Sequence, residues 1–149
     1  MHTIRQAKQE DLPLLLKVER DNMKESVDAL NPKPWSDDDC LDHLRGCLHE
    51  SSLWVCEDES GIIGHYCYSL IQRSGTISLD SMQVRSIRQN QGIGALLMAD
   101  FLARIHTVSA SKVALNIHLG SAAIRLYERF GICEVRRTSS HIRMEKDLA

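Results

Sequence analysis

The chain has 149 residues, of which 43% are hydrophobic and 26% charged, so it has the length and composition of one folded domain. This composition argues against a disordered chain. No apolar stretch approaches the roughly 20 residues that cross a bilayer, and the first residues show no apolar leader. The formal net charge of −2 excludes a nucleic-acid binder that relies on bulk charge.

The N-terminal part of the chain predicts one strand and two helices. Hydrophobic spacing predicts a strand at His2–Ala7 and a helix at Glu10–Glu25. Asn31–Pro34 is a loop, because its prolines fix the backbone. Ser36 then caps a helix that ends near His49, and acids in its first turn suit the positive end of the helix dipole.

The middle of the chain predicts a meander of three strands. We expect them at Leu53–Glu57, Ile62–Gln72 and Gly75–Val84. In the third strand the apolar positions switch phase, because Ile77 and Leu79 are odd-numbered whereas Met82 and Val84 are even-numbered. A β-bulge produces such a switch, and bulges gather near functional sites; a strand buried on both faces is the alternative.

The C-terminal part alternates helices with strands. Residues 91–108 predict an apolar helix that crosses over between parallel strands. We expect the remaining elements to be a strand at Lys112–His118, a helix at Ser121–Phe130, and strands at Ile132–Arg137 and His141–Lys146. The order β-α-α-β-β-β-α-β-α-β-β describes a mixed α/β domain.

The cysteines are odd in number and include no Cys-x-x-Cys pair; they are Cys40, Cys47, Cys56, Cys67 and Cys133. We therefore expect reduced, mostly buried thiols, without a disulfide framework, a zinc site or a nucleophilic cysteine. The seven histidines form no His-x-x-x-His ligand pair.

A glycine-containing loop at Gln89–Ala95 lies between the bent strand and the apolar helix. Small residues allow the backbone to approach a ligand, and N–H groups at a helix start attract phosphate. A Rossmann loop needs a third glycine where Leu97 stands, and a P-loop needs Gly-Lys-Ser/Thr, so both are rejected. On its own, Gly-x-Gly is equally compatible with tight packing.

A second motif, Ala-x-x-Leu-Tyr-x-x-x-Gly-Ile, occupies Ala123–Ile132. Together with the Gln-x-x-Gly-x-Gly loop at Gln89–Gly94, it resembles the GNAT superfamily of acyl-CoA-dependent N-acyltransferases. The bent strand before the loop is also similar. The resemblance is dense over residues 62–146. It implies one domain over residues 1–149, with a mixed central sheet, an antiparallel N-terminal meander, splayed parallel central strands and about four flanking helices.

The resemblance also implies acetyl-CoA as co-substrate and no metal. The loop N–H groups would wrap the coenzyme A pyrophosphate, and the strand around Met82 and Val84 would pair with the pantetheine arm. The N–H near Val84 would polarise the thioester carbonyl. The implied cofactor-binding residues are Met82, Val84, Gln89, Asn90, Gln91, Gly92, Ile93, Gly94, Ala95, Ala123 and Tyr127.

Two catalytic residues follow from the resemblance. Tyr127 matches the tyrosine that protonates the departing thiolate, although it is also interpretable as a packing residue. Asp80 matches the acid that takes the amine proton, usually through water. An alkylamine has a pKa of about 10.4 and arrives protonated, so its proton must be accepted. Asp80 is equally interpretable as a structural or substrate-orienting acid, and His118 is the rival base because its ordinary pKa is about 6.5.

Two positions depart from the family pattern. Gly120 stands where many members have Asn, so a capping or coenzyme contact is either absent or supplied by Ser121 or Asn116. Ile132 stands where Phe is usual, which we expect to change packing alone.

The acceptor region is predicted less sharply. Trp35, followed by acids at Asp37–Asp39, suits a cationic amine; alternatively, the acids cap a helix and the tryptophan closes the core. Residues 1–60 hold 7 Lys/Arg and 14 Asp/Glu, a net of −7, whereas residues 61–149 hold 11 and 6, a net of +5. We interpret the near-neutral total as two halves that prefer ligands of opposite charge.

We therefore expect a cytoplasmic N-acetyltransferase, monomer or homodimer, that moves acetyl directly from acetyl-CoA to a primary amine. The acceptor is a small molecule or peptide, with no nucleic-acid or membrane partner. A catalytically silent acyl-CoA sensor is the first alternative, and Tyr127 and Asp80 argue against it. A structural domain without coenzyme is the second, and the Gln89–Gly94 loop argues against that.

Overall fold

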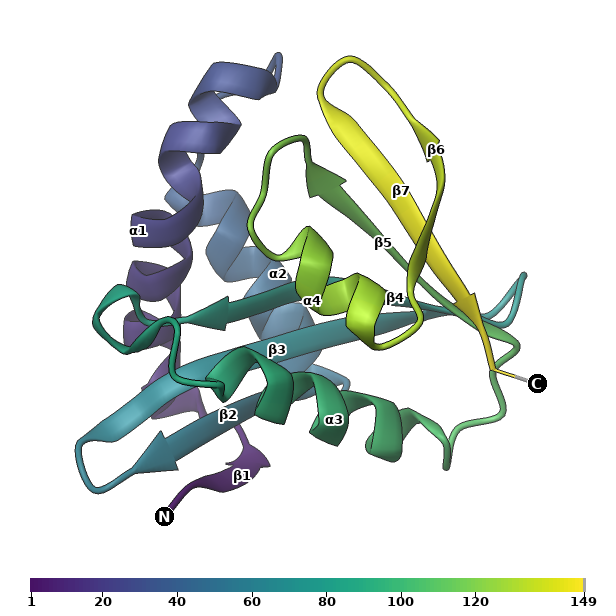
Figure 1. Ribbon diagram of the computed structural model, residues 1–149. Coiled ribbons are helices and arrows are strands. Elements are labelled where there is room, and N and C mark those ends of the chain that lie inside the picture. Colours follow the sequence, from purple (N-terminus) through teal and green to yellow (C-terminus); the bar gives the residue numbers. More distant parts are fainter. Residues whose placement is uncertain (149) are drawn as a thin grey trace.

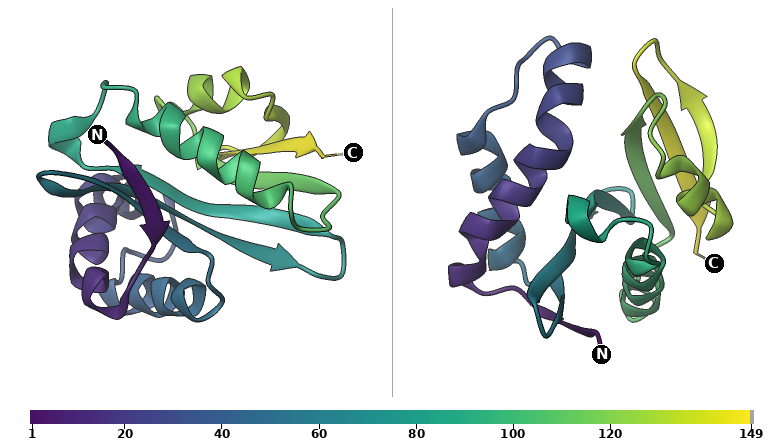
Figure 2. Two further views of the ribbon diagram at one scale, coloured as in Figure 1. Left: turned by 90° about the horizontal axis from the view of Figure 1, so that it is seen from below. Right: turned by 60° about the vertical axis from the view of Figure 1, so that its left-hand side comes forward.

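The sheet of this protein carries two helices on each of its faces (Figures 1 and 2). The computed structural model describes residues 1–148, which hold strands β1 (Thr3–Gln6), β2 (Leu53–Asp58), β3 (Gly61–Ile71), β4 (Thr76–Val84), β5 (Lys112–His118), β6 (Cys133–Arg137) and β7 (His141–Asp147). The helices are α1 (Leu12–Leu30), α2 (Asp37–His49), α3 (Ile93–Ile105) and α4 (Ile124–Arg129), with short 3-10 turns at Gln9–Asp11 and Ser86–Arg88.

The strands pair in the order β1-β2-β3-β4-β5-β7-β6 over residues 1–148. β4 and β5 are parallel and the other neighbouring pairs are antiparallel, so α3 forms the crossover that the sequence predicts. This is the mixed α/β arrangement expected of the GNAT fold. None of the helices in the described residues has both the length and the apolar character needed to cross a membrane.

Two apolar cores lie on opposite faces of the sheet. The first packs α3 and α4 against the strands, with Leu97 and Phe101 fully buried beside Ile77. The second packs α1 and α2 against β2 and β3, around Leu15 and Leu44. Burying each such side chain stabilises the fold by roughly 1.5–3 kcal/mol. The left view of Figure 2 shows the sheet between these helix layers.

Local chemistry explains where the helices begin and end. The predicted Ser36 cap is confirmed, because its side chain accepts a hydrogen bond from the Asp39 N–H. α1 continues five residues beyond its predicted end at residue 25, since the i,i+4 ion pair of Lys24 with Asp28 supports its last turn. α3 begins at Ile93 because Gly92 has φ of +81°, which lies outside the right-handed helical region.

The phase switch predicted in β4 is confirmed as a β-bulge. Cys67 of β3 pairs with Ser81, and the next residue, Tyr68, pairs with Leu79, so Asp80 is the extra residue. Leu79 and Met82 therefore both face the first core, while Asp80 and Ser81 both face α1 and α2. The bulge is what turns the Asp80 carboxylate toward the N-terminal helices.

β4 and β5 separate soon after they begin. They pair at Thr76–Lys112, Ile77–Val113 and Ser78–Ala114, and β5 then continues alongside β7 as far as His118. The two ribbons diverge clearly in Figure 1. The predicted splay of the central parallel strands is thus confirmed, and in residues 1–148 the β4 edge beyond Ser78 has no strand partner on that side.

Candidate active site

The free edge of β4 presents main-chain N–H groups. The Arg85 N–H donates to the Ile63 carbonyl of β3 at 2.9 Å, and successive N–H groups of a strand point to opposite edges. The N–H groups of Met82 and Val84 therefore point away from β3, toward the splay. The Val84 carbonyl is occupied, since it accepts from the side-chain amides of Asn22 at 3.0 Å and Gln89 at 3.2 Å.

The loop before α3 leaves the helix start open. Asn90 and Gly92 both have positive φ, which turns the chain sharply into the helix. The first helical hydrogen bond joins the Leu96 N–H to the Gly92 carbonyl, so the three preceding N–H groups have no partner within the helix. No described side chain caps them, and a Cβ built on Gly92 would meet no described atom within 4 Å. This is the free N-terminal end that attracts anions.

Gly94 determines how closely α3 and α4 approach. A Cβ at this position would lie 3.1 Å from a methyl group of Leu126 in α4. The tight packing that the sequence allowed for this motif is therefore found at Gly94. The helix start after Gly92 has open N–H groups, and phosphate binding there stays a prediction.

Arg88 anchors the loop to the β2–β3 turn. Its guanidinium lies 2.7 Å from the Asp58 carboxylate and donates to Ser60 and to Gln91. Hydrogen bonds from Ser60 and Arg88 hold the pKa of Asp58 well below its usual range. The Arg88 charge is thus already matched inside the protein.

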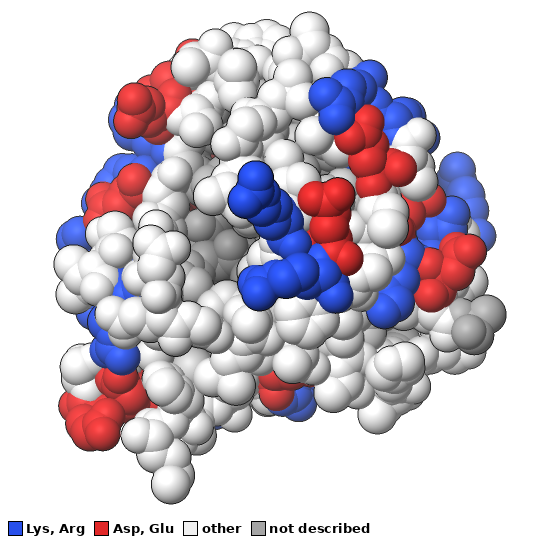
Figure 3. Space-filling view, viewed as in Figure 1, with Lys and Arg blue, Asp and Glu red and all other residues white. Residues whose placement is uncertain are grey.

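Exposed cations lie instead on α4. Arg125 and Arg129 are exposed, and neither forms an ion pair with a residue that the structure describes. Figure 3 shows basic side chains over α4, in the middle of this face and beside a hollow. These charges are positioned near the start of α3, because α4 packs on it through Leu126.

Tyr127 lies in α4 within the first core. The residue is 7% exposed, and its hydroxyl forms no hydrogen bond within residues 1–148. Burial raises the pKa of Tyr127 to about 12. The Tyr127 hydroxyl oxygen is not fully enclosed by protein atoms, so it remains accessible from outside the core. An accessible phenol that stays protonated is suited to donate a proton. Ala123, which begins the motif, accepts the Tyr127 N–H at 3.1 Å.

Asp80 lies on the other face, among several donors. Ser78 donates to its Oδ1 at 2.7 Å, Ser69 donates to its Oδ2, and Nε2 of His43 lies 3.3 Å from Oδ2. The bulge exposes its main chain, but its side chain is 17% exposed. Burial would raise the pKa of Asp80, and the hydrogen bonds from His43, Ser69 and Ser78 outweigh it, so the pKa is lowered. The structure does not bring Asp80 and Tyr127 into contact.

His118 lies apart from Asp80. It pairs with His141 across β5 and β7, and the two ring centroids are 4.6 Å apart. Burial and the neighbouring His141 lower the pKa of His118. His118 does not line the pocket that Asp80 lines.

A pocket of about 610 Å³ opens between α1, α2 and β4, a size typical of small-molecule sites. Trp35 lines it, with its indole N–H donating to Asp37 at 2.7 Å, so the tryptophan forms a pocket wall. Two of the three acids at the start of α2 are paired, Asp37 with Arg20 and Asp39 with Lys33. Of these three acids Asp39 lines the pocket, together with the acids Glu19 and Asp80.

Glu19 lines the pocket although the sequence motifs do not indicate it. Its Oε1 accepts from Ser81 at 2.5 Å and lies 3.2 Å from Nε2 of His65. Burial would raise the pKa of Glu19, but hydrogen bonds from His65 and Ser81 lower it. The available signal was its position four residues after the buried Leu15, which places an acid on the apolar side of a helix.

The splayed mixed sheet, with an uncapped helix start beside the splay, is the GNAT fold that the sequence motifs predict. The sequence profile of the acetyltransferase (GNAT) domain family matches residues 49–131, more than half of the chain. The chain therefore belongs to the GNAT acetyltransferase family. No curated protein matches it.

Solved structures share the fold over nearly their whole length. The ribosomal-protein-S18-alanine N-acetyltransferase of Escherichia coli is 18% identical, with 100% of this chain and 95% of that chain covered and a TM-score of 0.77. The PaiA N-acetyltransferase of Thermoplasma acidophilum, in complex with coenzyme A, is 18% identical, with 99% of each chain covered and a TM-score of 0.80. A ribosomal-protein-alanine N-acetyltransferase of Brucella melitensis is 22% identical, with 98% and 99% covered and a TM-score of 0.80.

Proposed function

We propose that the protein transfers an acetyl group from acetyl-CoA directly to a cationic primary amine. The observation that carries this proposal is the splay of β4 from β5, with an acid-lined pocket on one face and an open helix start on the other. Acetyl-CoA would approach from the α3 and α4 face and the amine from the α1 and α2 face. The two would then meet at the free edge of β4.

The acetyl-CoA side fits a polyanion. The loop Gln89–Ala95 would bind the pyrophosphate through the N–H groups at the start of α3, where no side chain of the described residues competes. Arg125 and Arg129 would add attraction for the phosphates, and Ala123 would line the same path. The PaiA structure, which contains coenzyme A, has this fold.

At the reacting centre the protein would supply two donors. The N–H groups of Met82 and Val84 point toward the splay, where they would pair with the pantetheine arm and polarise the thioester carbonyl. Tyr127 would protonate the departing thiolate. A positioned general acid of this kind contributes about 10²–10⁴-fold in rate. Because the amine attacks the thioester itself, no covalent enzyme intermediate is needed.

The amine side would use Asp80 to orient the acceptor. Both carboxylate oxygens already accept hydrogen bonds from protein donors, which suits an anchor for an ammonium group better than a strong base. The amine proton would leave through water in the pocket, and Trp35 would contribute a cation–π contact. Glu19 adds negative charge to the same pocket.

Calorimetry tests the co-substrate side. Wild-type protein is expected to bind acetyl-CoA at tens of micromolar protein, and the double variant Arg125→Ala/Arg129→Ala to bind it about 5-fold more weakly, with a smaller salt dependence. Arg73→Ala, at an exposed site in the β3–β4 turn, is the matched control and should bind like wild type. No binding by the wild type would contradict the proposal.

A further inference from the structure

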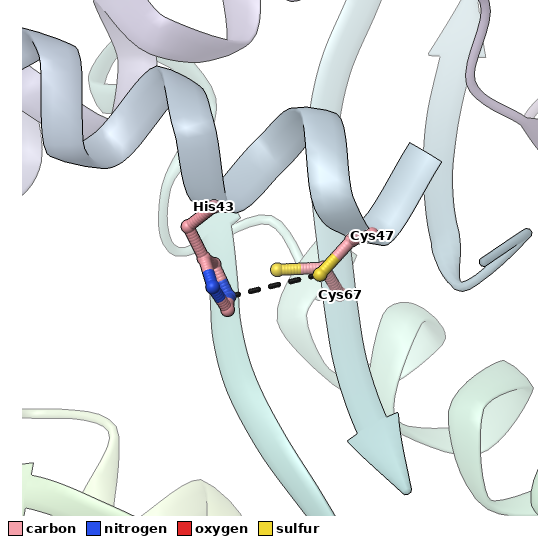
Figure 4. Close-up of side chains that lie close together, drawn as sticks. All are labelled: His43, Cys47 and Cys67. Atoms are coloured by element: carbon pink, nitrogen blue, oxygen red, sulfur yellow. Dashed lines mark hydrogen bonds between the residues drawn. The ribbon is translucent and has the colours of Figure 1, made fainter. Parts of the chain in front are cut away.

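Three metal-ligating side chains meet where α2 crosses β3 (Figure 4). His43 and Cys47 extend from one face of α2, four residues apart, and Cys67 extends from the middle of β3 to meet them. Their Nε2 or Nδ1, Sγ and Sγ atoms all lie within 4.8 Å of one another. Cys47 is nearly buried and Cys67 is fully buried, so both thiols are held by the protein interior.

The spacing of these atoms suits a tetrahedral ion. Zinc bonds of 2.0–2.1 Å to nitrogen and 2.3 Å to sulfur place neighbouring ligand atoms about 3.5–3.8 Å apart. Nε2 of His43 lies 3.6 Å from Sγ of Cys47, which is within this range. Two thiols and one imidazole are also a donor set that zinc prefers.

The Asp80 carboxylate lies beside the three-residue cluster. Asp80 Oδ2 lies 3.3 Å from Nε2 of the same His43. Three protein ligands leave the fourth position of a tetrahedral ion for water, which would lie beside this carboxylate. The ligands come from α2 and from the interior strand β3, which are packed together in the second core, so the set is held on rigid elements.

We infer that His43, Cys47 and Cys67 form a zinc(II) site whose fourth position lies on the side of Asp80. The two cysteines bind as thiolates and release their protons, and His43 binds as neutral imidazole. This inference does not depend on acetyl transfer. It reverses the expectation, drawn from spacing along the chain, that the cysteines hold no metal. A bound ion would fasten α2, one wall of the pocket, to β3.

The chain supplies matched controls. Cys40 lies on the same helix as Cys47, seven residues earlier and therefore on the same side, but outside the cluster. His49 ends that helix and is exposed. Cys40→Ser and His49→Gln change the same residue types in the same element without removing a proposed ligand.

Metal titration of reduced, chelator-treated protein tests the site, with cobalt(II) as the spectroscopic probe and zinc as competitor. We expect one cobalt per chain with a thiolate charge-transfer band that zinc abolishes. Cys47→Ser, Cys67→Ser and His43→Gln should each weaken zinc binding by at least about 100-fold, whereas both controls bind like wild type. Absence of binding in the wild type, or unchanged binding in the three ligand variants, would overturn the inference.

A measurement on the wild type alone covers the case in which Cys67→Ser fails to fold. X-ray absorption at the zinc edge should show two sulfur neighbours at about 2.3 Å and nitrogen or oxygen neighbours at about 2.0–2.1 Å. A shell of nitrogen and oxygen alone would reject the site. The site would also be rejected if Cys47 and Cys67 were found joined as a disulfide in zinc-loaded protein under the same reducing conditions.

Discussion

Asp80 Oδ2 lies 3.3 Å from Nε2 of His43, which joins the bulge of β4 to α2 at the wall of the pocket. This contact depends on the β-bulge, in which Asp80 is the extra residue of β4. Without the bulge, residue 80 would pair with a residue of β3, and the side chains of β4 would alternate between the two faces without interruption. The acid is thereby presented to the N-terminal helices and not to α3. This relationship determines on which face the amine is expected to bind.

Replacing Asp80 with Asn tests its proposed role as an anchor for the ammonium group. The change removes the negative charge and preserves the shape. We expect KM for the amine to rise by about 10-fold or more, which corresponds to about 1.4 kcal/mol, and KM for acetyl-CoA to stay the same. Asp42→Asn, on the exposed side of α2, is the control and should leave both constants unchanged. Equal effects on both substrates would contradict an acceptor-side role.

Tyr127→Phe tests the general acid. With chemistry rate-limiting, kcat is expected to fall by about 10²-fold or more. The unfolding free energy should change by less than about 0.5 kcal/mol, because the hydroxyl has no hydrogen-bond partner within residues 1–148. Steady-state kinetics and urea unfolding check the two expectations. Tyr68→Phe, on β3, is the matched control. Full turnover by the Tyr127 variant would remove it from the mechanism.

The pH dependence of kcat provides a separate test of Tyr127. An acid donates while it is protonated, so activity is lost as the pH rises through its pKa. Burial raises this pKa from the ordinary 10.0 to about 12. We therefore expect the pH profile of kcat to show no fall near pH 10 that belongs to Tyr127. A limb at that pH that disappears in Tyr127→Phe would show that the hydroxyl is not shielded as the structure indicates.

Two glycine substitutions should have opposite effects on stability. Gly92 has φ of +81°, so Gly92→Ala should destabilise the fold by about 1 kcal/mol and also raise KM for acetyl-CoA by crowding the helix start. Gly46 lies inside α2, and a Cβ there meets no described atom within 4 Å. Gly46→Ala should therefore stabilise by about 0.5–1 kcal/mol without affecting KM. Chemical denaturation measures the unfolding free energy, and kinetics measure KM. Changes in unfolding free energy of the same sign in the two variants would contradict the backbone roles given to Gly92 and Gly46.

The sequence predicts those features that are local in the chain. The odd-to-even switch between Leu79 and Met82 predicts the bulge, and Ser36 predicts the start of α2. The motif at Ala123–Ile132 gives the family, although its helix is shorter than predicted, since Ser121 accepts from the Ala123 N–H and forms a turn before the helix.

Features that depend on how distant segments pack could not be predicted. Glu19 meets Ser81 across 62 residues, and Cys47 meets Cys67 between a helix and a strand, so no spacing along the chain indicates either contact. The one local signal in the cysteine cluster is the His43-x-x-x-Cys47 spacing, which places both side chains on one face of α2.

The most direct test of the central claim is the release of free coenzyme A thiol from acetyl-CoA in the presence of a broad panel of primary amines. The account predicts thiol release with cationic amines, in amounts equal to the acetylated product, and strong loss of that release in Tyr127→Phe. Acetyl-CoA binding without thiol release across the whole panel would contradict it and would favour a catalytically silent acyl-CoA sensor.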